Sequence, residues 1–113
     1  MRSEWLFIVR VGPESRQAAI EVLSEVMTFA AFDVPLRLLF LDQGAKLLLA
    51  GKDPELSGML SALALYGVTE LFVETASCEA AAGDSLSHAL AVSEIPRLGI
   101  SDFILSHRRV IGG

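Results

Sequence analysis

Cys78 is the one cysteine of this 113-residue sequence and its most obvious candidate nucleophile. It comes shortly after an apolar segment at 71–73. A helix that began close to it would favour the reactive thiolate through its unpaired backbone N–H groups. Glu79 follows it directly, however, and a neighbouring negative charge disfavours the thiolate. Because free cysteines are also commonly buried as small apolar residues, the residue types favour a packed or inert thiol over a reactive one.

The histidines and glycines form no recognisable catalytic, metal or nucleotide site. His88 and His107 lie nineteen positions apart, with no Glu or Cys at ligand spacing from either, so we predict no metal site and expect both side chains at the surface. Each follows a serine, but the G-x-S-x-G elbow of serine hydrolases is missing. Gly12 alone follows the first apolar segment, so no glycine-rich loop is available to bind a nucleotide cofactor.

Asp42 and the C-terminal glycine pair are the remaining candidates. Asp42 closes the second apolar segment as a phospho-accepting aspartate would, but segment 11–13 offers no acidic pair to hold magnesium. We therefore expect Asp42 to accept backbone hydrogen bonds in the turn at Gly44. Gly112 and Gly113 resemble the flexible tail of a sulfur carrier that ends in a thiocarboxylate. Such carriers are built on hairpins and one long helix, a pattern that differs from this sequence.

Composition restricts the function classes further. Hydrophobic residues make up 52% of the chain and charged residues 20%, which predicts one domain over 1–113 with apolar surface left for a partner. The formal net charge of −5 disfavours direct binding to nucleic acid. Every apolar run is much shorter than the ~18–20 residues of a membrane span. Residues 1–10 fit neither a signal nor a transit peptide, so we expect a cytoplasmic protein without membrane contact.

The order of apolar segments predicts an α/β fold. Runs at 4–11 and 36–41 are typical of strands covered on both faces, and the segment between them has the apolar periodicity of a helix at 13–31. Asp53 and Pro54 begin another helix, which Gly67 closes. The other expected elements are a helical turn at 45–50, a helix at 76–82, and strands at 71–73, 90–92 and 103–105.

Connections through helices favour a mainly parallel sheet, so the predicted fold is a three-layer α/β sandwich with about five strands. Pro96 and Gly99 leave room for barely one helical turn between the last two expected strands. Functional groups of such sheets gather beyond the carboxyl ends of the strands. The segments expected at that edge are 11–14, 42–44 and 75–84.

Several stretches resemble the DsrE/DsrF family, and within it the TusC/DsrF branch. The most specific one reads Ala-Phe-Asp-Val-Pro-Leu at 31–36, followed by Leu-Phe-Leu-Asp-Gln-Gly-Ala at 39–45. The entry to the third strand, Tyr-Gly-Val at 66–68 and Leu-Phe-Val at 71–73, and the closing stretch at 91–105 are similar to the same branch. The resemblance covers most of residues 4–105 and implies a DsrE/DsrF-like fold.

The resemblance also implies a function. Family members form a cytoplasmic sulfur-relay complex of three homologous subunits, which passes persulfide sulfur toward the 2-thiouridine of tRNA wobble positions or serves dissimilatory sulfur metabolism. The relay cysteine belongs to the TusD/DsrE-like subunit, so a TusC-like chain is a non-catalytic partner of TusD/DsrE-like and TusB/DsrH-like proteins. A cofactor is not implied.

Two departures from the family pattern leave alternatives open. Counting back from Gly83, the family's cysteine position falls on Thr75 here, and Cys78 lies three residues later. The 94–99 segment is also shorter than the helix that the family places before its last strand, which predicts a trimmed or differently packed C-terminal region. The alternatives are a persulfide sulfurtransferase that uses Cys78 and a stand-alone, homo-oligomeric DsrE-like protein.

Overall fold

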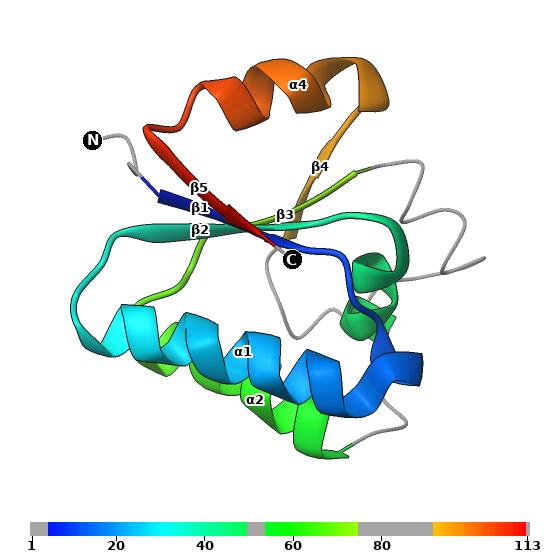
Figure 1. Cartoon of the computed structure of the whole chain (residues 1–113), viewed down its shortest axis with the longest axis vertical. Coiled ribbons are helices and arrows are strands. Elements are labelled where there is room, and N and C mark those ends of the chain that lie inside the picture. Colours follow the sequence, from blue (N-terminus) through cyan, green and yellow to red (C-terminus); the bar gives the residue numbers. More distant parts are fainter. Residues whose placement is uncertain (1–4, 50–53, 75–91, 113) are drawn as a thin grey trace.

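A five-stranded, all-parallel sheet is the centre of the molecule (Figure 1). The computed structural model describes residues 5–49, 54–74 and 92–112. The strands lie in the order β4-β3-β2-β1-β5. Their bounds are β1 Trp5–Val9, β2 Leu36–Phe40, β3 Leu71–Glu74, β4 Val92–Ile95 and β5 Arg109–Gly112. The three inner strands are the apolar runs of the sequence, because helices cover both faces of the sheet.

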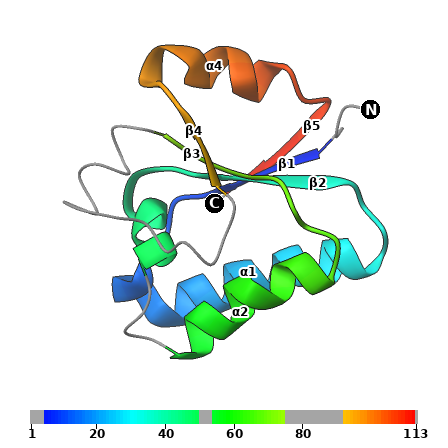
Figure 2. The ribbon, with the colours of Figure 1, turned by 180° about the vertical axis from the view of Figure 1, so that it is seen from behind.

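Two helices form the layer on one face of the sheet (Figures 1 and 2). They are α1, Arg16–Ala31, which follows the short 3-10 turn η1, Pro13–Ser15, and α2, Pro54–Leu65. In α1 the buried side chains recur at steps of three and four residues, as the sequence predicts for one apolar stripe. They are Ala19, Leu23, Val26 and Ala30. Together with side chains of α2 and the facing side of the sheet they form the larger hydrophobic core.

Both helices end in the same way. Asp33, after α1, and Gly67, after α2, have positive φ angles of 61° and 90°. The next residue in each case donates its N–H to a carbonyl five positions back, at 3.3 Å from Val34 to Phe29 and at 2.9 Å after α2. This is the Schellman arrangement, in which a left-handed residue stops the helix and turns the chain back toward the sheet.

Of the described elements, only α4, Arg97–Leu105, packs on the opposite face of the sheet (Figure 2). Its inward side chains are Ile100, Phe103 and Ile104, which contact Leu6, Ile8, Leu39 and Leu41. Helices on both faces complete the three-layer α/β sandwich, so the fold predicted from the sequence is confirmed. A second 3-10 segment, η2, runs over Asp42–Leu49 and contains most of the helical turn expected at 45–50.

The predictions for the C-terminal region are wrong in two respects. Residues 103–105 form the end of α4 and not a strand, and the fifth strand is β5, which pairs with β1. The stretch from Pro96 therefore holds a nine-residue helix where barely one turn was expected, because Pro96 occupies the N-cap position and Gly99 is accommodated within the first turn. The segment is therefore long enough for a helix before the last strand, and the reason for expecting a trimmed region does not hold.

The remaining expected elements lie at the edges of the described residues. The strand expected at 90–92 is observed at 92–95, and residues 90 and 91 lie outside the described part. The helix expected at 76–82 also lies outside it.

Candidate functional site

Loops from two neighbouring strands are packed tightly at the carboxyl edge of the sheet, where the sequence predicts the functional segments. The N–H of Leu41 donates to the carbonyl oxygen of Val9 at 3.0 Å, and the N–H of Gly44 donates to that of Leu41 at 2.9 Å. A Cβ atom on Gly44 would lie 2.0 Å from the oxygen of Val9, and one on Gly12 would lie 2.6 Å from the backbone oxygen of Gln43. These two glycines let the loops after β1 and β2 interlock.

Asp42 stands at the start of η2 with a φ angle of 52°, and its side chain is exposed. Lys46, on the same 3-10 segment, contacts the carboxylate of Glu14 at 3.5 Å, which links this loop to the one after β1. Asp42 and Gly44 are thus placed at the predicted edge. Backbone hydrogen bonds and close packing hold the loop against the one after β1.

Glu74 is a buried carboxylate at the end of β3 that the sequence reasoning missed. Its side chain is 9% exposed, and Oε2 lies 3.6 Å from Nε of Arg97 at the start of α4. A buried carboxylate requires compensation by a cation or hydrogen-bond donors. Arg97 is the only Lys or Arg between positions 70 and 102. A buried carboxylate in this region could therefore be expected to pair with it. The ion pair ties the start of α4 to the carboxyl edge of the sheet.

Thr75, Cys78 and His88 lie outside the described residues.

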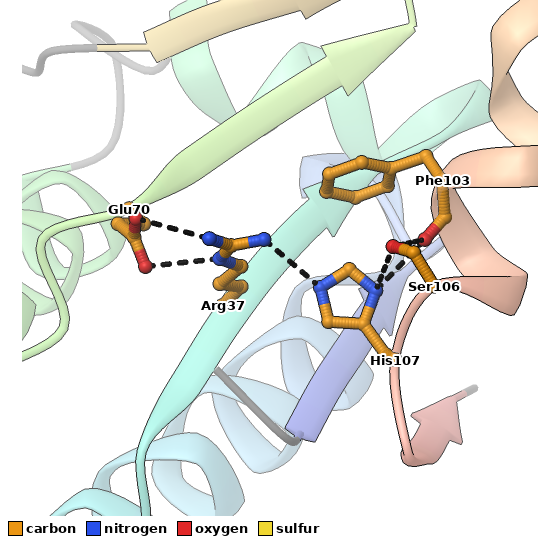
Figure 3. A network of polar contacts seen from close by, with 5 residues as sticks. All are labelled: Arg37, Glu70, Phe103, Ser106 and His107. Atoms are coloured by element: carbon orange, nitrogen blue, oxygen red, sulfur yellow. Dashed lines mark hydrogen bonds and ion pairs between the residues drawn. The ribbon is translucent and has the colours of Figure 1, made fainter. Parts of the chain in front are cut away.

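A polar network occupies the opposite, amino-terminal side of the sheet (Figure 3). Arg37 on β2 donates from Nε to Glu70 Oε2 at 2.9 Å and from Nη2 to Glu70 Oε1 at 3.4 Å. Its Nη1 lies 3.4 Å from Nε2 of His107. Nδ1 of His107 lies 2.8 Å from the carbonyl oxygen of Phe103. The network therefore connects the middle of the sheet to the turn that follows α4.

His107 is buried, with 8% of its surface exposed, so the prediction that it lies at the surface is wrong. A carbonyl oxygen only accepts hydrogen bonds, and a guanidinium only donates them. Nδ1 must therefore carry the ring proton for Phe103, and Nε2 must accept from Arg37. Ring contacts complete the environment, since the Phe103 ring centroid lies 4.8 Å from that of His107 and 4.7 Å from that of Phe72.

Ser106 and His107 do not form a nucleophile–base pair, although Ser106 Oγ and His107 Nδ1 are 3.3 Å apart. A base would have to accept the hydroxyl proton, whereas Nδ1 donates to Phe103. Ser106 Oγ itself donates to the same carbonyl oxygen at 2.6 Å. Within the described ranges, no three His, Cys, Asp or Glu side chains come together as metal ligands. The network is a structural tie between α4 and the sheet.

Gly112, part of the C-terminal pair, lies in β5 in register with Ile8 of β1. A Cβ atom on it would lie 3.2 Å from Cβ of Ile8. It is thus a strand residue, and of the glycine pair only Gly113 lies outside the described residues. Among the described helices, none has both the length and the apolar character needed to cross a bilayer.

A curated relative decides the family. The TusC homolog of Pseudomonas aeruginosa is 32% identical over 117 residues, which cover 98% of this chain and 98% of that protein. The chain belongs to the TusC/DsrF-like family. The resemblance to the TusC/DsrF branch that the sequence indicated is therefore confirmed. A scan against protein-family models gave no match.

A solved structure supports the fold of this TusC/DsrF-like chain. The crystal structure of the YchN protein from Escherichia coli matches it with a TM-score of 0.76, over 99% of this chain and 100% of that one. Sequence identity is 15%, so the likeness concerns the fold.

Proposed function

We propose that this chain is a non-catalytic subunit of a cytoplasmic sulfur-relay complex that supports 2-thiouridine formation at the wobble position of tRNA. The observation that carries the proposal is its 32% identity, over nearly its full length, to a TusC homolog. Its partners are homologous TusD/DsrE-like and TusB/DsrH-like subunits, and a cysteine of the TusD/DsrE-like partner carries the persulfide sulfur. The chain contributes one domain, residues 1–113, as contact surface.

The side chains at both edges of the sheet support a structural role. Glu74 is engaged with Arg97, and Arg37 is engaged with Glu70 and His107. Within the described ranges, these polar groups are used to hold elements of the fold together. The described part also exposes large hydrophobic side chains that a partner could cover: Phe32, Leu65, Tyr66, Leu98, Leu105 and Val110.

Replacement of Cys78 tests the proposal in cells. In a strain that lacks the gene, wild-type protein and Cys78→Ser are both expected to restore 2-thiouridine in tRNA, measured by mass spectrometry of digested nucleosides, whereas an empty vector is not. Replacement of the relay cysteine of the TusD-like subunit is the positive control for loss. Failure of Cys78→Ser in an intact complex would contradict the non-catalytic role.

A second experiment asks directly whether Cys78 carries sulfur. The purified chain is incubated with a cysteine desulfurase and cysteine, and its mass is measured without reducing agent. A persulfide would add about 32 Da to the thiol. We expect no such addition, and its appearance on Cys78 would favour the sulfurtransferase alternative.

A further inference from the structure

The outer surface of α4 carries two leucines whose side chains are largely exposed. Leu98 is 95% exposed and Leu105 is 79% exposed. They lie seven positions apart, which is two helical turns, so both side chains project from the same face. The inward face of α4 is formed by other residues and contacts the sheet. The outward leucines therefore play no part in the core.

A carboxylate lies between these leucines on the same face. Asp102 is four positions after Leu98 and three before Leu105, and its side chain is exposed. In the part of the chain that the structure describes, no Lys, Arg or His nitrogen lies within ion-pair distance of it, whereas Arg97 contacts Glu74 and Arg37 contacts Glu70. The outer face of α4 thus presents an apolar group, an uncompensated negative charge and a second apolar group.

We infer that this face of α4 binds a helix of a different protein subunit, which presents a basic residue between two apolar residues. The inference rests on the proposed function, because that function supplies the partner subunits. Apolar side chains one heptad apart are the spacing at which a second helix, crossing at a shallow angle, packs against both. The single charge between them selects a partner with a Lys or Arg at the centre of the contact.

A second copy of this chain fits the same face poorly. In a symmetric, antiparallel pair of α4 helices, Leu98 of one copy would lie opposite Leu105 of the other. The twofold axis would then pass between positions 101 and 102, so the two Asp102 carboxylates would face each other. Like charges at such a centre oppose association. The charge pattern therefore favours a different subunit over self-association.

α4 is also the least buried of the described α-helices. None of its nine residues is fully buried, and among the described elements it alone covers its face of the sheet, whereas α1 and α2 share the other (Figure 1). A helix docked on its outer surface would add a further layer there and bury both leucines.

Binding to purified subunits tests the inference. The probes are the TusD-like and TusB-like proteins of the same organism, each titrated against the full chain by calorimetry. Leu98→Ala and Leu105→Ala are each expected to weaken binding of one of these subunits about tenfold, as is typical of central interface side chains. Alanine preserves the helix. Asp102→Lys is expected to weaken it at least as much, and Asp102→Asn less.

Leu65→Ala is the matched control. Leu65 is 87% exposed at the end of α2, on the other side of the sheet, and its replacement is expected to leave the affinity unchanged. Because all three leucines are largely exposed, each variant should keep the thermal stability of the wild type, which separates loss of binding from loss of fold.

The possible results distinguish this inference from the proposed function. If the wild-type chain binds a subunit and the α4 variants bind it equally well, the α4 site is wrong and the proposed function stands. If the wild-type chain binds neither subunit, alone or when both are present, the proposed function fails and the inference fails with it. If the chain alone is a dimer that Leu98→Ala converts to monomer, the occupant is a second copy and the inference is overturned.

Discussion

The interlocked loops at the carboxyl edge of the sheet make Gly44→Ala a severe change. The added methyl group would lie 2.0 Å from the backbone oxygen of Val9, where real Cβ atoms keep at least 3.0 Å, so the loop must move by about 1 Å. That movement stretches the hydrogen bonds of Gly44 to Leu41 and of Leu41 to Val9, each worth about 0.5–1.5 kcal/mol. It also loosens Leu47 and Leu48 of η2, which are fully buried and contribute about 1.5–3 kcal/mol each when packed.

From these contributions we expect Gly44→Ala to lower the free energy of unfolding by about 3 kcal/mol, since the buried leucines lose only part of their packing. With a urea dependence of about 1.5 kcal/mol per molar, the midpoint of unfolding falls by about 2 M. Fluorescence of Trp5, the only tryptophan, reports the transition because its ring packs against Phe29 in the core.

Gly58→Ala provides the matched control for this measurement. Gly58 lies in α2, and an added Cβ would have no atom within 4 Å. Alanine is the better helix former, so this variant should be more stable by about 0.5–1 kcal/mol. If Gly44→Ala unfolds at the wild-type urea concentration, the loops after β1 and β2 are not interlocked.

Two further predictions concern the C-terminal region. His107→Ala removes the hydrogen bonds that the ring makes with Arg37 and with the carbonyl of Phe103, together with its packing on the Phe103 ring, and should lower the free energy of unfolding by about 2 kcal/mol. Urea denaturation measures the change; a loss below about 0.5 kcal/mol would show that the network does not hold α4. Deletion of Gly112 and Gly113 should leave tRNA 2-thiouridine unchanged in complemented cells, because Gly112 pairs within the sheet and is no flexible tail. Loss of thiolation in a folded truncated protein would revive the thiocarboxylate carrier.

The family pattern and the inner part of the fold could be predicted from the chain alone. The segments that became β1, β2 and β3 are mostly apolar, as is typical of strands buried on both faces. The apolar stripe of α1 is equally clear, because a helix of sixteen residues is long enough for the helical period to repeat several times. The turn at Gly67 follows from a residue that tolerates a left-handed conformation.

The outer elements depended on tertiary contacts. Phe103, Ile104 and Leu105 are three apolar residues in a row, which suits a short strand or a helix equally well. Their helical state is decided by the sheet beneath, which accepts Phe103 and Ile104 while Leu105 stays exposed. β5 has no apolar run of its own. It is a strand because its backbone pairs with that of β1 in the parallel sheet.

The polar network required the fold for a similar reason. Arg37, Glu70 and His107 are dozens of positions apart, and nothing in their local neighbourhoods indicates that they meet. Local patterns record which residues favour a helix or a strand, and these preferences are strongest in long, regular segments. Short segments are too short to repeat a pattern, and residues far apart in the sequence share no local pattern. The positions of α4, β5 and the network were therefore determined only by packing around the sheet.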